Sequence, residues 1–178
     1  FFLFMVMAGT FPALGQPLTF FHLDKSNGLS DNTITALTMD KSGILWLGTP
    51  AHLNSYDGRT VSEYTTDDSG KSIGILSMVC DKNNCIWMLL NNKTVAMLDE
   101  KRRLHKIIIR EGGKEIRPDY LLPHTARGVL FIKGNHLYTP DAGNPELMRR
   151  LSWDEDQRIQ RGFERINLWD DDKIVFSG

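Results

Sequence analysis

Short runs in which apolar and polar residues alternate follow one another from residue 33 onward, separated by clusters of turn-forming residues. Alternation with a period of two predicts β-strands, whereas helical repeats would show a period of 3.6 residues. In the first stretch we expect four strands with turn signals about 8–12 residues apart: Thr33–Met39, Ile44–Gly48, His52–Tyr56 and Val61–Tyr64. The pattern predicts an all-β protein.

The four-strand pattern repeats along the chain. Asp81 lies 41 residues after Asp40, and each of the two begins a tight turn rich in Lys, Ser, Asn or Gly. Four large aromatic residues fall in the expected second strands at spacings of 41, 44 and 45 residues: Trp46, Trp87, Phe131 and Phe176. A repeat of about 40–45 residues with four strands is typical of a β-propeller blade, and leucine-rich repeats are shorter. We expect these aromatic side chains to form blade cores rather than a sugar-stacking platform.

The expected propeller is incomplete and has about three and a half four-stranded blades. Within a partial propeller domain at 16–178, the blades are predicted at about 27–66, 70–112, 116–152 and 160–178. The last of these ends after its second strand. A lone apolar strand at 18–23 is expected to close the final blade of the ring.

Residues 1–15 have the features of a secretory signal peptide. An uncharged apolar run comes first, and Ala13 and Gly15 have the small-residue spacing of a cleavage site. A buried helix is the alternative, which Pro12 disfavours, and the run is too short for a transmembrane helix. Because no initiator Met or basic segment precedes the run, we expect that the true start is missing and that the mature chain is exported.

Composition narrows the classes of function. Hydrophobic residues make up 41% of the 178, and the formal net charge is −1, with no basic block longer than Lys101–Arg103. Direct binding of nucleic acid is therefore not expected. The acidic clusters lack the ligand pattern of a calcium loop, and no nucleophile motif is recognisable. The five histidines are too scattered in the sequence for a local metal motif: His22, His52, His105, His124 and His136. We assign no catalytic residue, no metal site and no cofactor.

Cys80 and Cys85 flank a predicted four-residue turn. A hairpin of this kind would place them roughly opposite each other, within reach of a disulfide, and an exported protein would allow the bond to form. The alternative is two free thiols that point to different faces of the sheet. Both alternatives remain open from the sequence.

Ligand contacts are expected on one face of the propeller, where the fourth-to-first and second-to-third strand connections meet. Amide and imidazole side chains suit hydroxyl-rich sugars, and turn residues selected for backbone shape are the alternative for each one. Ser30 and Pro50 fall on the same face. The candidate ligand-binding residues are Asn27, Asn32, His52, Asn91 and Asn92.

Three segments of the first blade resemble the two-component regulator propeller repeat: Asn27–Ile34, Asp40–Thr49 and Leu53–Gly58. More closely, the chain resembles the amino-terminal periplasmic sensor region of hybrid two-component histidine kinases from Bacteroides-type bacteria. The resemblance covers Gln16–Gly178 and is most specific in the first blade. One departure is His52, because the family usually has glycine before the Leu-Asn pair, where a left-handed backbone is tolerated.

This resemblance implies that the fragment is a periplasmic sensor and not itself an enzyme, whereas its full-length parent is a histidine kinase. Such proteins carry two seven-bladed propellers, an immunoglobulin-like linker, an inner-membrane span, and histidine kinase, receiver and DNA-binding parts. The implied ligand is a glycan-derived oligosaccharide. The implied partners are the second propeller and the kinase parts of the same parent chain. The full-length receptor is expected to be a homodimer that controls polysaccharide-utilisation genes. The alternatives are a periplasmic propeller enzyme, either a lyase or a glycosidase, and a non-signalling interaction scaffold.

Overall fold

The structure, a computed structural model, describes residues 20–64, 73–124, 128–134, 136–141, 144, 147–151, 165–168 and 174–177. The expected signal peptide at 1–15 lies outside this part of the chain. Nearly all regular structure in the described residues is antiparallel β-sheet, which confirms the all-β prediction. No helix in the described residues is long and apolar enough to cross a membrane.

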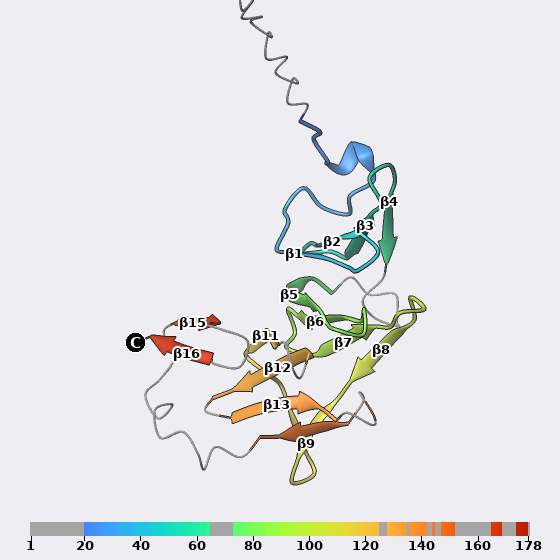
Figure 1. Cartoon of the computed structure of the whole chain (residues 1–178). Coiled ribbons are helices and arrows are strands. Elements are labelled where there is room, and N and C mark those ends of the chain that lie inside the picture. The colour runs from blue at the N-terminus through green and yellow to red at the C-terminus, as the bar shows by residue number, and fades with distance from the viewer. Residues whose placement is uncertain are drawn as a thin grey trace, which may run out of the picture.

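Three antiparallel sheets have four strands each, and in each sheet the strands lie in chain order, as in propeller blades (Figure 1). Blade 1 contains β1 (Ala36–Met39), β2 (Leu45–Gly48), β3 (Leu53–Tyr56) and β4 (Val61–Tyr64). Blade 2 contains β5 (Ile75–Cys80), β6 (Ile86–Leu90), β7 (Val95–Leu98) and β8 (Leu104–Ile107). Blade 3 contains β11 (Tyr120–His124), β12 (Gly128–Lys133), β13 (His136–Pro140) and β14 (Met148–Arg150). A last pair contains β15 (Arg165–Leu168) and β16 (Ile174–Ser177).

In blades 1 and 2 an Asp directly follows the first strand, and its contacts explain why Asp and Trp recur at the same spacing in these two blades. Asp40 Oδ1 accepts the main-chain N–H groups of Ser42 and Ile44, and its Oδ2 accepts the indole N–H of Trp46 at 3.1 Å. One carboxylate thus closes the turn and satisfies the donor of a fully buried side chain. In blade 2, Asp81 makes the same three bonds, to the N–H groups of Asn83, Cys85 and Trp87.

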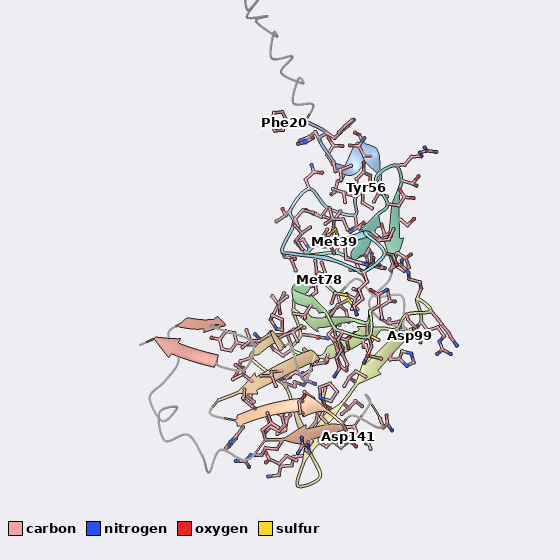
Figure 2. The ribbon with its side chains drawn as sticks, in the orientation of Figure 1. Phe20, Met39, Tyr56, Met78, Asp99 and Asp141 are labelled. Atoms are coloured by element: carbon pink, nitrogen blue, oxygen red, sulfur yellow. The ribbon has the colours of Figure 1, made fainter. Side chains whose placement is uncertain are left out.

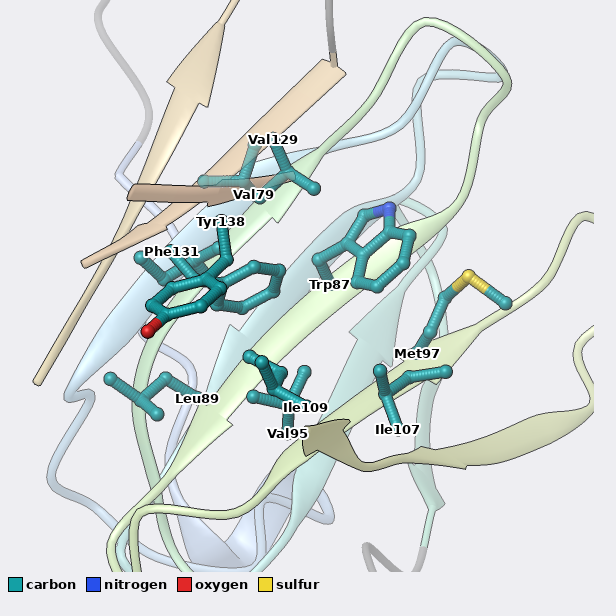
Figure 3. Close-up of a cluster of buried hydrophobic side chains, with 11 residues drawn as sticks. Val79, Trp87, Leu89, Val95, Met97, Ile107, Ile109, Val129, Phe131 and Tyr138 are labelled. Carbon is teal, nitrogen blue, oxygen red and sulfur yellow. The ribbon is translucent and has the colours of Figure 1, made fainter. Parts of the chain in front are cut away.

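The hydrophobic core lies between the blades. The cluster between blades 1 and 2 contains Trp46, and the cluster between blades 2 and 3 contains Trp87 and Phe131 (Figure 3). These three side chains are 1%, 1% and 0% exposed, and Trp87 meets Phe131 edge to face at 5.8 Å. Each blade is therefore stabilised mainly by its neighbour. Phe176 pairs with Ile166 in the β15–β16 register, and its side chain lies outside the described part.

A two-stranded hairpin between blades 2 and 3 was not predicted. It contains β9 (Ile109–Glu111) and β10 (Lys114–Ile116). Gly112 and Gly113 both have positive φ, at 56° and 80°, as a tight two-residue hairpin turn requires. The expected end of the second blade at residue 112 therefore falls on the tip of this hairpin.

The ring-closing role expected for residues 18–23 stays a prediction, because none of the sheets in the described residues includes this segment. Residues 18 and 19 lie outside the described part, and residues 20–23 form no strand. A short 3-10 helix, η1 (Lys25–Asn27), follows them. Phe20 and Phe21 are 87% and 84% exposed, so no sheet covers them here (Figure 2).

Candidate functional site

One end of the blades brings together the connections that the sequence placed on a common face. The Ile75 N–H donates to the Thr49 carbonyl at 2.9 Å, and the Asn91 N–H donates to the Gly74 carbonyl at 2.8 Å. A Cβ at Gly74 would lie only 2.5 Å from the Pro50 carbonyl oxygen, so the connections of blades 1 and 2 touch through their backbones. We call this surface the loop face, and it consists of residues 49–52, 73–74, 91–94, 117–119 and 133–134.

The loop face continues to blade 3 through charged side chains that the sequence analysis did not select. Lys93 Nζ donates to the Asp119 carbonyl at 3.4 Å. Lys133 Nζ lies 3.0 Å from Asp119 Oδ1, and the Gly134 N–H donates to Asp119 Oδ2. Arg117 Nη1 donates to the Asn92 carbonyl at 3.5 Å. Lys93 directly follows the two predicted amides, so its position in the same turn was a usable signal.

His52 is on the loop face, with a side chain that is 18% exposed. Its Nε2 lies 3.5 Å from Glu63 Oε1 on the neighbouring strand β4. Its Nδ1 is buried and has no hydrogen-bond partner in the described part of the chain. One ring nitrogen is therefore engaged by a carboxylate, and the other is held away from solvent rather than presented to a ligand.

Asn27 and Asn32 use their side-chain oxygens within the amino-terminal segment. Asn27 Oδ1 accepts the Asp24 N–H as part of the cap of η1, and Asn32 Oδ1 accepts the Lys25 N–H at 2.9 Å. These bonds support the turn alternative for both residues. None of the described contacts joins either of them to His52.

Asn91 and Asn92 lie on the loop face, and both are exposed. Asn92 Oδ1 accepts both the N–H and the hydroxyl of Thr94, so that oxygen shapes the turn. The Asn92 carbonyl faces Arg117, as described above. Of the five candidate residues, the structure thus brings three onto one face: His52, Asn91 and Asn92.

A buried polar network behind the loop face was also missed. Thr49 and Asn54 are both 0% exposed. Thr49 Oγ1 donates to the His52 carbonyl, and Ser30 Oγ lies 2.9 Å from Thr49 Oγ1. Asn54 Nδ2 donates to Ser30 Oγ, while Asn54 Oδ1 accepts the Ser30 N–H. This network attaches the amino-terminal segment to blade 1 and fixes the backbone of the 49–52 connection.

The geometry around Cys80 and Cys85 matches the alternative of two free thiols that point to different faces of the sheet. Both thiols are free. In the β5–β6 register Cys80 pairs with Ile86, and the Asp81 N–H bonds to the Cys85 carbonyl, so the two cysteines are not opposite each other. Because alternate residues of a strand face opposite sides, Cys85 packs on the cluster toward blade 3 and Cys80 on the cluster toward blade 1.

Two clusters of titratable side chains have shifted pKa values. Burial alone would raise the pKa of Asp99, but hydrogen bonds from Arg103 and His105 lower it well below its usual value. Hydrogen bonds from Arg150 and then Tyr138 lower the pKa of Glu111. In the described part of the chain, no three His, Cys, Asp or Glu side chains gather closely enough to hold a metal ion.

Comparison with known proteins begins with blade 1. Residues 28–51 match the family model described as two component regulator propeller. A search of curated proteins finds no sequence that matches significantly. The extracellular domain of a putative hybrid two component system from B. thetaiotaomicron is similar in structure, with a TM-score of 0.57 and 18% identity over 69% of this chain and 19% of that one.

Two other similar structures are lyases. Virginiamycin B lyase from Staphylococcus aureus has a TM-score of 0.52 and 10% identity over 68% of this chain and 42% of that one. A streptogramin B lyase has a TM-score of 0.53 and 13% identity over 72% of this chain and 43% of that one. The chain spans less than half of each of these structures, and likeness at such identities shows the fold alone. The predicted fold is confirmed: the described residues form β-propeller blades, and residues 28–51, at the first of these blades, match the two component regulator propeller model.

Proposed function

We propose that the chain is the ligand-sensing propeller region of an exported hybrid two-component sensor. The observation that carries this proposal is the match of residues 28–51 to the two-component regulator propeller model. The likeness to the extracellular domain of a hybrid two component system supports the same role. The proposed location is the periplasm, in a parent anchored in the inner membrane.

The proposed ligand is a glycan-derived oligosaccharide that binds on the loop face. Exposed amides at Asn91 and Asn92 can exchange hydrogen bonds with sugar hydroxyls, and the blades hold them on a rigid framework. Binding would be passed to a second propeller and to kinase parts of the same parent, acting as a homodimer, and would control polysaccharide-utilisation genes. The chain itself would perform no catalysis.

Isothermal titration of the chain against a panel of oligosaccharides tests this proposal. We expect saturable binding of one glycan class, with a weakened affinity in the Asn91→Ala/Asn92→Ala variant. Asn27→Ala is the control, because its side chain caps η1 away from the loop face. Absence of binding to every member of the panel would contradict the sensing role.

A propeller lyase is the second candidate, because lyases recur among the similar structures. One of them, a catalytically inactive H270A variant of virginiamycin B lyase, was solved with quinupristin. Incubation of this chain with quinupristin, followed by mass spectrometry, separates the two proposals. The sensor proposal expects the compound to remain intact, whereas its conversion would favour the enzyme.

A further inference from the structure

Charge is distributed unevenly along the chain, although the net charge is only −1. Residues 20–68 carry 3 basic and 7 acidic residues, a formal charge of −4. Residues 69–151, which contain blades 2 and 3, carry 14 basic and 8 acidic residues, a formal charge of +6. Residues 152–178 return to −3, with 4 basic and 7 acidic residues. Blades 2 and 3 therefore form a basic centre between two acidic ends, and such a centre attracts anions.

On the loop face this positive charge gathers where blades 2 and 3 meet. Three cationic side chains contact two neighbours there. Lys93 and Lys133 both contact Asp119, and Arg117 contacts Asn92. Asp119 uses one carboxylate oxygen for Lys133 and the other for the Gly134 N–H, so its charge is already engaged. Lys93 and Arg117 instead donate to main-chain carbonyls, which leaves their own charges uncompensated at those contacts.

The remaining donors of these two cations are available for a ligand. An ammonium has three N–H donors, and the Lys93 ammonium makes one hydrogen bond, of 3.4 Å, within the described part of the chain. Arg117 also pairs with Glu115, but both side chains are half exposed, at 58% and 46%, and water weakens such a pair. A carboxylate or sulfate could therefore bind to both cations without breaking a buried contact.

The backbone of Lys93 gives independent support. Its φ is 62°, a left-handed conformation that costs a non-glycine residue roughly 1–2 kcal/mol. In the corresponding connection of blade 3 the positive φ falls on Gly134. A strained position that keeps a long cationic side chain suggests that the side chain has a use.

We propose that the loop face at the junction of blades 2 and 3 binds an acidic saccharide, one that carries a carboxylate or sulfate group. Lys93 and Arg117 contact the anionic group, and the exposed amides of Asn91 and Asn92 contact the neighbouring hydroxyls. Lys133 stays with Asp119 and fixes the geometry of the site. The proposal rests on the proposed sensing function and narrows its ligand class.

The test uses the full chain and isothermal titration with defined probes. These are a galacturonic acid trisaccharide, its methyl-esterified neutral form, a sulfated disaccharide and inorganic sulfate. The test variant is Lys93→Gln/Arg117→Gln, and Lys93→Arg should retain binding because it keeps the charge. Lys101→Gln is the matched control, because Lys101 lies in the turn at the opposite end of blade 2. Thermal denaturation of each variant checks that the fold is intact.

We expect one of the two acidic saccharides to bind at least about tenfold more tightly than the neutral trisaccharide, with an affinity that falls as salt rises. The double variant should lose about tenfold or more, and Lys101→Gln should bind normally. Equal binding of neutral and acidic probes, unchanged by the double variant, would overturn this inference and leave the sensing proposal standing. Inorganic sulfate that binds as tightly as the saccharides would mean an adventitious ion only and would also overturn it. Absence of binding to every probe overturns the acidic ligand class, and the wider oligosaccharide panel then decides the sensing role separately.

Discussion

The Asp carboxylates that follow the first strands of blades 1 and 2 each accept two main-chain N–H groups of a turn and one indole N–H. For Asp81 these are two main-chain groups of its own turn and the indole of Trp87, which is 1% exposed. A buried indole N–H without an acceptor is costly, as is a turn that loses its acceptor. The repeat of Asp with Trp six residues later is therefore a folding signal, which the sequence showed as a spacing and the structure explains.

Replacement of Asp81 by Ala should lower the free energy of unfolding by about 2–3 kcal/mol, because a buried donor and the turn donors lose a charged acceptor. Urea denaturation measures this. Asp57→Ala is the matched control, since Asp57 accepts only the N–H groups of its own exposed turn, at Arg59 and Thr60. An equal loss in the two variants would contradict the role assigned to the indole bond.

Within the part of the chain that the structure describes, three non-glycine residues have positive φ, and all lie in turns of blade 2: Asn84, Lys93 and Arg102. The turns of blade 1 use glycine for this purpose, at Gly43 and Gly58. Asn84 Oδ1 accepts the Lys41 N–H of blade 1, and the Arg102 guanidinium lies 4.4 Å from the centre of the Trp46 ring. The residues of blade 2 that have a strained backbone thus use their side chains to contact the neighbouring blades.

Substitutions of Arg102 test whether its contacts with blade 1 outweigh the strain of its backbone. Arg102→Gly relieves backbone strain but removes the stacking on Trp46 and the 3.4 Å ion pair with Asp40. Arg102→Ala removes the same contacts and keeps the strain. We expect the stability order Arg, then Gly, then Ala, with steps of about 0.5–1 kcal/mol in thermal denaturation. A glycine variant more stable than the native chain would show that the contacts do not offset the strain.

The thiol of Cys85 should react slowly in the folded chain. Burial, and then the nearby Asp81 carboxylate, raises its pKa to about 11, so the thiolate is roughly a hundredfold rarer than for a thiol at the ordinary value of 9.0. Iodoacetamide labelling at pH 8, followed by mass spectrometry, should be slow in buffer and fast in urea without reductant. A lack of labelling in urea would instead indicate the disulfide that the structure does not contain.

At the scale of elements, the strands were largely predictable and the hairpin was not. Alternation located all four strands of blade 1 within a few residues, because successive side chains of a pleated strand point to opposite faces of the sheet. The hairpin β9–β10 was hidden because its second strand is short and mostly polar, and its Gly-Gly tip was interpreted as a blade boundary. Two adjacent glycines between short strands are a turn signal that could have revealed it.

A side-chain cluster attaches this hairpin to blade 3. The Tyr138 hydroxyl donates to Glu111 Oε2 at 2.9 Å, and Arg150 bonds to the other Glu111 oxygen. Burial, followed by the bond to Glu111, raises the pKa of Tyr138 to about 12. The neutral phenol is favoured in the folded state, so its contribution to stability is complete below pH 10 and is lost as the pH rises from about 10 to 12.

The Tyr138→Phe variant should therefore differ from the native chain most strongly below pH 10. We expect a loss of about 1 kcal/mol at pH 8, because the Glu111 carboxylate loses a hydrogen-bond donor. The difference should shrink as the pH approaches 12. Urea denaturation at a series of pH values measures both, and a difference that does not vary with pH would contradict the raised pKa.

At the scale of the whole molecule, the sequence predicted where the candidate site lies better than which side chains form it. The strand order made it predictable that the two kinds of connection share a face, and His52, Asn91 and Asn92 lie there. The cross-blade contacts of Lys93 and Arg117 could not be predicted, because they depend on the rotation of one blade against the next. The hydrogen bonds between Ser30 and Asn54 could not be predicted either, because they join residues that lie 24 positions apart in the sequence.

One face of blade 1 presents apolar side chains to solvent. On strand β1, Leu37 and Met39 are 59% and 63% exposed, while the alternate residue Ala36 packs on the cluster between blades 1 and 2. We expect the chain to self-associate through this face, since exposed apolar sheet faces promote association. Leu37→Lys/Met39→Lys should shift the chain toward the monomer in light scattering. The control is Phe20→Lys/Phe21→Lys, which removes exposed apolar surface outside the sheet, and an equal shift in both variants would contradict the assignment.

The Asp-centred turn also bears on how such a chain can grow. Blades 1 and 2 each carry a turn acceptor and the partner of the buried indole within seven consecutive residues, at Asp40–Trp46 and Asp81–Trp87. A duplicated blade of this kind therefore keeps the contacts that close its own first turn. The contacts between neighbouring blades come from other residues, in turn positions such as Asn84 and Arg102. The side chains at these positions take no part in the Asp-centred contacts that close the first turn of their own blade. Gene duplication could therefore lengthen the array first, and later substitutions at these few positions could adapt each new copy to its place in the ring.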